Sequence, residues 1–300
     1  MKNFFITTMF LFVMHALHAT KGIVYHNGVD FPFLEHVCED QRLVLRCSHI
    51  VIVNPFKYDM ELVNCRGWEK IGDVADRYHA QLAIAGGLCK LDDGEPQELF
   101  KMDGRYVHNG HINHLGAVAW NRGELSKMQI DKIDHSSGIV SPCFEQKNVD
   151  FWENAQNILG ADTVLLKNGE IVVRPQENSL IPSSFFDGNY GKTAIGITEE
   201  GVLIFVALNI FLGDEKEEGC DGRLSSLEVA KVMENLGCID ALSLSGKPSM
   251  FYQGKTFSSL SEEDVGNVLV LKCRDECFEE DEDSDEEYNE EEDEYCFFGV

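Results

Sequence analysis

The chain has 300 residues, 44% of them hydrophobic, and a formal net charge of −27 at pH 7. So many apolar side chains can bury a full core, which excludes a chain that is disordered throughout. The strong negative charge disfavours binding to the phosphate backbone of a nucleic acid.

Residues 1–20 have the layout of a cleavable signal peptide. Lys2 precedes an apolar run over residues 4–13, and small residues follow at Ala16 and Ala19. A membrane anchor is the alternative, but the apolar run is short for a membrane span. We therefore predict cleavage close to Ala19 and a secreted or periplasmic protein with no stable membrane insertion afterwards.

Most of the body is predicted to be β-strand, because short runs rich in Val, Ile and Leu alternate with turn residues. Two turns, Lys167-Asn168-Gly169 and Glu199-Glu200-Gly201, each lie between two apolar runs, as a hairpin requires. The predicted strands are Arg42–Cys47, His49–Val53, Met60–Val63, Leu82–Ala85, Gly116–Trp120, Thr163–Leu166, Thr193–Ile197, Val202–Leu208, Asp240–Leu244 and Asn267–Cys273.

Two helices are predicted, over Trp68–Ala80 and Ser225–Leu236, because each segment repeats apolar residues at spacings of three and four. Ser225 or Ser226 can cap the start of the second helix, and Gly237 can end it. Many strands and few helices predict an α+β fold, in which a mixed, strand-rich sheet carries the helices packed on it. A single domain over residues 21–273 is the simplest organisation.

Residues 274–300 form an acidic segment. Between residues 275 and 295 there are fifteen Asp or Glu and no Lys or Arg, so this stretch supplies more than half of the net charge. Such a block of like charges cannot collapse on itself, which predicts a disordered tail. A solvated tail without a function is favoured over loose calcium binding or docking to a basic partner.

Neither a metal nor a cofactor is predicted. The ten cysteines are too scattered for a zinc ribbon. After export some of them could form disulfides, whose pairing the sequence leaves open, or they could stay buried thiols. His108, His111 and His114 could together bind zinc or copper, but the Asn and Gly residues between them are typical of a loop, so solvent-facing histidines are favoured.

Two predicted strands end in glycine-containing turns, Ala85-Gly86-Gly87 and Leu244-Ser245-Gly246. Glycine lets a backbone approach a ligand without obstruction by a Cβ atom. If both ends lie on one rim of a sheet, that rim is the expected place for a pocket.

Five segments follow one another between residues 40 and 273: Ala85-Gly86-Gly87-Leu88-Cys89, Leu99–Arg105, Leu159–Gly169, Tyr190–Gly196 and Leu236–Ser249. Together and in this order they resemble motifs of the phosphodiester glycosidase family. The family motifs are Asn-Gly-Gly-Phe-Phe, a hairpin with a Gly turn, Gly-Gly-Pro-x-Leu-x-x-Asp-Gly, His-Pro-Arg-Thr-Ala-Ile-Gly, and a helix followed by Leu-Gly-x-x-Asp-Ala-Leu-Asn-Leu-Asp-Gly-Gly-Gly-Ser. No single segment would suffice to establish this resemblance.

The resemblance implies a fold and a set of site residues. It implies a single phosphodiester-glycosidase-like domain that cleaves a sugar from a phosphate. The catalytic candidates at motif positions are Lys192 and Ser245. If activity is retained, the carboxylates to test first are Asp162, which is also a catalytic candidate, and Asp92 and Asp93 in the loop after Gly87. The substrate-binding candidates are Gly86, Gly87, Tyr190, Thr193, Gly246 and Ser249.

The polar positions of the motifs depart from the family pattern. The family Asn, His, Arg, second Asn and Asp are replaced in this chain by Ala85, Tyr190, Lys192, Ser243 and Ser245, and two motif glycines are Lys247 and Pro248. Serine cannot supply the negative charge of an Asp, and lysine lacks the planar fork with which arginine holds phosphate.

Two hypotheses therefore stand. One is an exported hydrolase of a glycosidic bond to phosphate. The other is a catalytically impaired relative that binds a glycan or a host protein on the same scaffold. The expected ligand is a sugar phosphodiester or a glycan.

Overall fold

The structure is a computed structural model that describes residues 23–27, 36–38, 41–43, 47–90, 92–110, 116–134, 140–173, 192–209, 225–244, 249–252, 255–258 and 264–274. The predicted signal peptide and the predicted acidic tail, apart from Arg274, lie outside these residues. The guanidinium of Arg274 lies 3.0 Å from Asp59 Oδ1. The expected α+β fold, rich in strands and poor in helices, is confirmed. Every strand pairing within the described residues is antiparallel, and the strands are distributed over three large sheets and one two-stranded ribbon.

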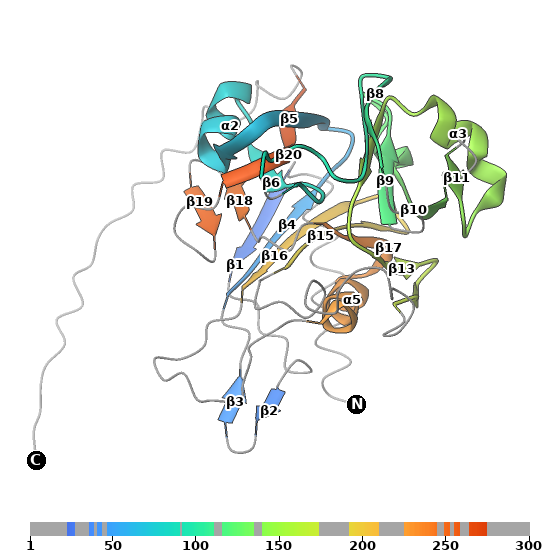
Figure 1. Ribbon diagram of the computed structural model, residues 1–300. Coiled ribbons are helices and arrows are strands. Elements are labelled where there is room, and N and C mark those ends of the chain that lie inside the picture. Colours follow the sequence, from blue (N-terminus) through green and yellow to red (C-terminus); the bar gives the residue numbers. More distant parts are fainter. Residues whose placement is uncertain are drawn as a thin grey trace, which may run out of the picture.

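The largest sheet has seven strands and forms the middle of the molecule (Figure 1). Its order is β1 (Ile23–Asn27), β4 (Cys47–Val53), β16 (Leu203–Asn209), β15 (Lys192–Thr198), β17 (Cys238–Ser243), β13 (Val164–Lys167) and β14 (Glu170–Ile171).

The six-stranded sheet has the order β11 (Ser141–Pro142), β10 (Gln129–Asp134), β9 (Gly116–Trp120), β12 (Asn157–Gly160), β7 (Leu99–Met102) and β8 (Arg105–Asn109). The five-stranded sheet has the order β19 (Lys255–Ser258), β18 (Ser249–Tyr252), β6 (Leu82–Ala85), β20 (Asp264–Cys273) and β5 (Tyr58–Lys70). The ribbon consists of β2 (His36–Cys38) and β3 (Gln41–Leu43).

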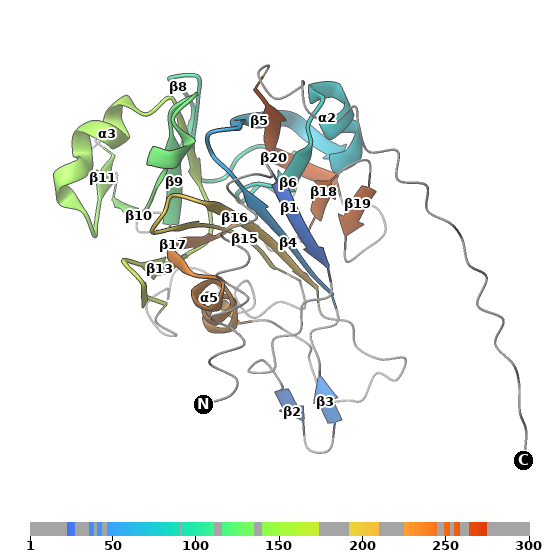
Figure 2. The same ribbon diagram turned by 180° about the vertical axis from the view of Figure 1, so that it is seen from behind.

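One central core lies between the three large sheets, and each sheet contributes fully buried side chains to it, among them Phe205, Val118 and Ile84. Each of three described α-helices then covers the outer face of one sheet. Helix α5 (Ser226–Asn235) packs on the seven-stranded sheet, α2 (Ile71–Tyr78) on the five-stranded sheet and α3 (Val149–Asn154) on the six-stranded sheet. The view from behind shows the same division (Figure 2).

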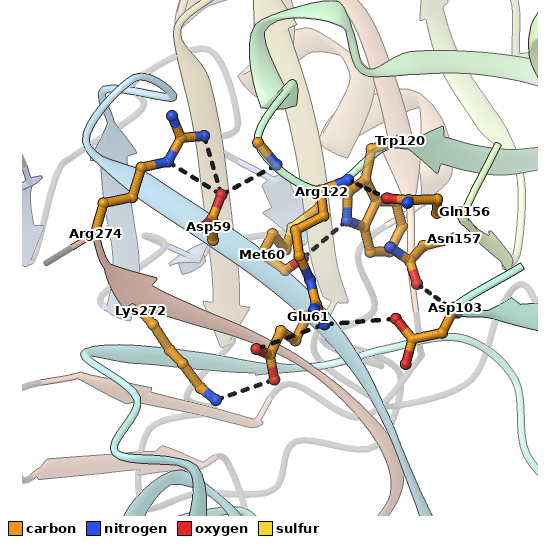
Figure 3. Close-up of polar contacts among 11 residues, drawn as sticks. Asp59, Met60, Glu61, Asp103, Trp120, Arg122, Gln156, Asn157, Lys272 and Arg274 are labelled. Carbon is orange, nitrogen blue, oxygen red and sulfur yellow. Dashed lines mark hydrogen bonds and ion pairs between the residues drawn. The ribbon is translucent and has the colours of Figure 1, made fainter.

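Polar contacts join the five- and six-stranded sheets (Figure 3). The indole N–H of Trp120 donates to the carbonyl oxygen of Met60 over 2.9 Å. The guanidinium of Arg122 lies 3.5 Å from the carboxylate of Asp103 and 3.9 Å from that of Glu61. These contacts bring the end of β9 against β5, so the two sheets have a fixed relation at this corner.

Two hairpin turns have the backbone that their sequences require. Asn168 and Gly169, between β13 and β14, have φ angles of 52° and 79°, and Asp103 and Gly104, between β7 and β8, have 49° and 78°. Two successive positive φ angles are the mark of a type I′ turn, which matches the twist of the strands it joins. The predicted hairpin at Lys167-Asn168-Gly169 is therefore confirmed.

The first predicted helix is shorter than expected. Residues 68–70 continue β5, where Glu69 and Lys70 pair with Val265 and Asp264 of β20, so α2 begins only at Ile71. The second predicted helix is confirmed as α5, apart from its outermost residues. Ser225 and Glu228 form a reciprocal capping box at its start.

Replacing Ser225 with alanine is expected to lower the free energy of unfolding by about 1 kcal/mol, because the capping box loses the hydroxyl that accepts from the backbone N–H of Glu228 and donates to the Glu228 carboxylate. Urea denaturation would measure the change. Ser225→Thr is the matched control, since threonine keeps a hydroxyl that can make both contacts. Equal losses in the two variants would show that the cap does not stabilise α5.

Candidate functional site

The ends of β6 and β17 converge. Strand β18 pairs antiparallel with β6, with Met250 opposite Ile84, so the start of β18 lies beside the end of β6. Only residues 245–248 separate Leu244 from Ser249, and five residue steps span at most about 18 Å. The two ends are therefore close, but they belong to different sheets, β6 to the five-stranded sheet and β17 to the seven-stranded sheet, so the prediction of one rim of one sheet is wrong. Ser245 and Gly246 themselves lie outside the described residues.

At the end of β6, Gly86 and Gly87 pack against other parts of the backbone. The N–H of Gly87 donates to the side-chain oxygen of Asn267 over 2.7 Å, and the N–H of Gly86 donates to the carbonyl oxygen of Asn267 over 3.0 Å. A Cβ atom on Gly86 would lie 2.1 Å from Asn267 Oδ1, and one on Gly87 would lie 2.1 Å from the carbonyl oxygen of Gly160. Both glycines thus allow close packing within the protein, while their proposed contact with substrate stays a prediction.

A polar cluster lies at the neighbouring strand ends, formed by Asp162, Lys192 and Ser243. Lys192 begins β15, Ser243 ends β17, and Asp162 comes two residues before β13. The hydroxyl of Ser243 donates to Asp162 Oδ2 over 3.1 Å, and Lys192 Nζ lies 3.8 Å from the same oxygen. Two of the three predicted catalytic residues, Asp162 and Lys192, are therefore neighbours.

The cluster is almost completely buried, with 4%, 3% and 0% of Asp162, Lys192 and Ser243 exposed. Burial raises the pKa of Asp162, although the charge of Lys192 and the hydrogen bond from Ser243 act in the opposite direction. Raised pKa values in buried charge clusters are more frequent at functional sites than elsewhere. Asp162 is thus a carboxyl whose proton affinity exceeds that of an exposed aspartate.

The structure does not place all predicted residues on one face. Ala194 packs on the α5 side and Ile195 in the central core, so the alternation of a strand puts Lys192 on the α5 side and Thr193 towards the centre. Ser243 shares the α5 side because Ala241 does. Thr193 is therefore separated by the sheet from the cluster that contains Lys192.

Other predicted residues lie elsewhere. Tyr190 is outside the described residues, and so are His111 and His114. The backbone of Ser249 begins β18. Asp92 and Asp93 are exposed in the loop after β6, and Asp93 accepts a hydrogen bond from the N–H of Glu95. His108 Nδ1 lies 3.0 Å from the carbonyl oxygen of Glu98, and the described residues contain no group of three potential metal ligands.

A second buried charge cluster surrounds Lys167 at the opposite end of β13. Its Nζ atom donates to Glu145 over 2.9 Å, to Asp240 over 3.1 Å and to the carbonyl oxygen of Ile130 over 2.8 Å, and Asp131 lies 3.9 Å away. Asp131 also accepts hydrogen bonds from three backbone N–H groups, at residues 143, 144 and 145. Every partner holds a neighbouring segment in place, so this cluster has a structural role.

Sequence reasoning did not select Ser243 or Asn267 as site residues. In the sequence, Ser243 stands out only as a replacement of the second Asn of the family motifs. Asn267 is 1% exposed in an otherwise apolar strand, and its side-chain N–H groups lie 3.4 Å from the carbonyl oxygen of Gly87 and 2.8 Å from Cys89 Sγ. The available signal was its polarity, because a polar side chain inside a buried strand needs a specific partner.

A family model described as phosphodiester glycosidase matches residues 78–272, which contain both the glycine turn and the polar cluster. The chain belongs to the phosphodiester glycosidase family. The resemblance of its motifs is thereby confirmed. No curated protein sequence matches the chain.

Two solved structures share the fold of the chain. The catalytic domain of zebrafish N-acetylglucosamine-1-phosphodiester alpha-N-acetylglucosaminidase, auto-inhibited by its pro-peptide, aligns with a TM-score of 0.63 and 16% identity over 85% of each chain. A hypothetical protein from Synechocystis aligns with a TM-score of 0.63 and 14% identity, over 84% of this chain and 62% of that one. This chain thus spans less than two thirds of the Synechocystis protein. At such low identity the likeness concerns the fold alone.

None of the described helices is both long and apolar enough to span a membrane.

Proposed function

We propose that this protein is an exported phosphodiester glycosidase that hydrolyses the bond between a sugar and a phosphate, with Asp162 and Lys192 at its active site. Export is supported by the signal-like residues 1–20. Membership of the family supports the reaction type. The observation that carries the proposal is the buried pair of a carboxyl and an ammonium group at converging strand ends.

In the proposed reaction, the oxygen of a water molecule bonds to the anomeric carbon while the bond from that carbon to the phosphate oxygen breaks. The electron pair leaves with the phosphate, and the proton lost by water goes to a base. Asp162 is suited to be that base, and its negative charge also stabilises the oxocarbenium-like transition state. Lys192 compensates the charge that develops on the departing phosphate.

Turnover of a chromogenic sugar phosphodiester by the purified full chain tests the proposal. Lys192→Met is expected to lower kcat/KM by a factor of ~10² to 10³, the usual effect of removing one preorganised charge. Lys192→Arg should retain much more activity, and Lys127→Met is the matched control because Lys127 is exposed and pairs with Glu124 at the surface. Lys192→Met with unchanged kcat/KM would refute the assignment of this site.

The second candidate function is binding without hydrolysis. It is favoured by Ala85 and Ser245, which stand where the family motifs have a polar Asn and an Asp. Saturable binding of a sugar phosphate without turnover would support it. Absence of both binding and turnover would contradict both functions.

A further inference from the structure

The two oxygens of the Asp162 carboxyl have different surroundings. Both the hydroxyl of Ser243 and the ammonium of Lys192 approach Oδ2. Oδ1 is also buried, but no hydrogen-bond donor in the described part of the chain reaches it. A buried carboxylate oxygen without a donor costs free energy, and folded proteins rarely retain one without a reason.

Nearby backbone N–H groups cannot supply the missing donor because they are already used. The N–H of Asp162 donates to Ser243 O, that of Ser243 to Thr163 O, that of Leu244 to Thr193 O and that of Gly116 to Asp162 O, all over 2.9 to 3.2 Å. These bonds belong to the joints between strands and are fixed by the fold. A donor for Oδ1 therefore has to come from outside this framework.

The position of the cluster suits a ligand. It lies where β15 begins, β17 ends and β13 is about to begin, rather than in the middle of the sheet. Ligand sites of sheet proteins are commonly built at strand ends, since loops can cover and uncover them. Lys192, 3.8 Å from Oδ2, is too distant for a hydrogen bond and has donors left for an anion.

We propose that Asp162 Oδ1 is a ligand-binding atom, which accepts a hydrogen bond from a hydroxyl or amide N–H of a sugar whose phosphate lies against Lys192. Ser243 is the positioning residue, because its hydrogen bond to Oδ2 directs Oδ1 towards the ligand. This inference rests on the proposed function and names the atom that distinguishes a sugar phosphate from phosphate alone. It also gives a reason for the buried carboxyl of Asp162 in a chain where Ser245 replaces the Asp of the family motif.

Calorimetric titration of the full chain with glucose 1-phosphate and with inorganic phosphate tests the proposal. The wild-type protein is expected to prefer glucose 1-phosphate by about 10- to 100-fold, the contribution of a hydrogen bond to a charged group. Asp162→Asn should reduce this preference by about tenfold or more without weakening the binding of inorganic phosphate. Asp76→Asn, at an exposed position of α2, is the control and should change neither.

Ser243 gives an independent variant in case Asp162→Asn does not fold. Ser243→Ala should reduce the preference for glucose 1-phosphate, and Ser243→Thr, which keeps the hydroxyl, should restore it. A folded Asp162→Asn protein with the wild-type preference, or a wild-type protein that does not distinguish the two probes, would overturn the inference. If the wild-type protein prefers glucose 1-phosphate but does not turn over the sugar phosphodiester, only the proposed hydrolysis is refuted. If it turns over the phosphodiester but Asp162→Asn leaves the preference unchanged, only the role of Oδ1 is refuted.

Discussion

Replacing Lys167 with methionine is expected to lower the free energy of unfolding by about 3–5 kcal/mol near pH 7, because three carboxylates would lose their shared cation. Lys167 is 5% exposed, so most of its ammonium group is removed from water and depends on these partners. The partners come from segments far apart in the sequence, Asp131 on β10, Glu145 after β11 and Asp240 on β17. The loss therefore weakens the contact between two sheets.

The pH dependence of this loss has a definite sign. Burial alone would lower the pKa of Lys167, but the hydrogen bond to Glu145 and the carboxylate charges more than offset it, so the pKa is raised. The stabilisation by Lys167 is thus fully present below the pKa of an unfolded lysine, about 10.4, and is lost as pH rises through the folded value. Burial already raises the pKa of Asp131, and removal of Lys167 raises it further.

The loss of unfolding free energy caused by Lys167→Met should consequently shrink as pH falls from about 7 towards 4, because the folded variant takes up a proton on Asp131, whose pKa is raised. Urea denaturation of both proteins across this range measures the difference. Lys127→Met is the surface control and is expected to cost under about 0.5 kcal/mol. If the difference in unfolding free energy between the wild-type protein and Lys167→Met did not change with pH, the electrostatic explanation would be contradicted.

Gly87→Ala is expected to destabilise the protein by about 3 kcal/mol, since the new methyl group would overlap the backbone of β12. Its Cβ atom would lie 2.1 Å from the carbonyl oxygen of Gly160 and 3.0 Å from Leu159 Cδ1. Backbone atoms cannot rotate away as a flexible side chain can, so the end of β6 or of β12 must move. Thermal or urea denaturation would measure the effect.

Gly104→Ala separates packing from backbone strain. Gly104 has a φ of +78° and nothing within 4 Å of the position of a Cβ atom, so alanine there meets strain alone and should cost about 1 kcal/mol. If Gly87→Ala and Gly104→Ala lost similar amounts of unfolding free energy, the close approach of the end of β6 to β12 would be contradicted. A large excess loss for Gly87→Ala is the expected outcome.

The sequence predicted those elements whose pattern is local. Leu82–Ala85 and Gly116–Trp120 are strands with the predicted bounds, since both are short apolar runs between turn residues. β10 was missed because Gln129–Asp134 has only two apolar side chains, Ile130 and Ile133, which are three residues apart, and because Asp131 is buried on partners that no local pattern reveals. β12 was missed because its run of four residues contains only two large apolar side chains.

The candidate site was predictable in its place but not in its contacts. The glycine-containing turns indicated that the ends of β6 and β17 come close, although the two strands belong to different sheets. The pairing of Asp162 with Lys192 and Ser243 depends on the register of β13, β15 and β17, which tertiary packing decides. For the same reason the sequence did not reveal that Lys192 and Thr193 lie on opposite faces of the seven-stranded sheet. That follows from the packing of one face on α5 and of the other on the central core.

Strand β20 lies between β5 and β6, and it is the last strand along the described chain. Its residues Val268 and Leu269 pair with Val63 and Leu62 on one side and with Ala85 and Ile84 on the other. Until this strand has left the ribosome, no strand joins β5 to β6, and the edges that face it keep unpaired backbone groups. Folding of this sheet must therefore wait until residues 264–273 have been synthesised, and a nascent chain that stops before residue 264 is expected to bind chaperones.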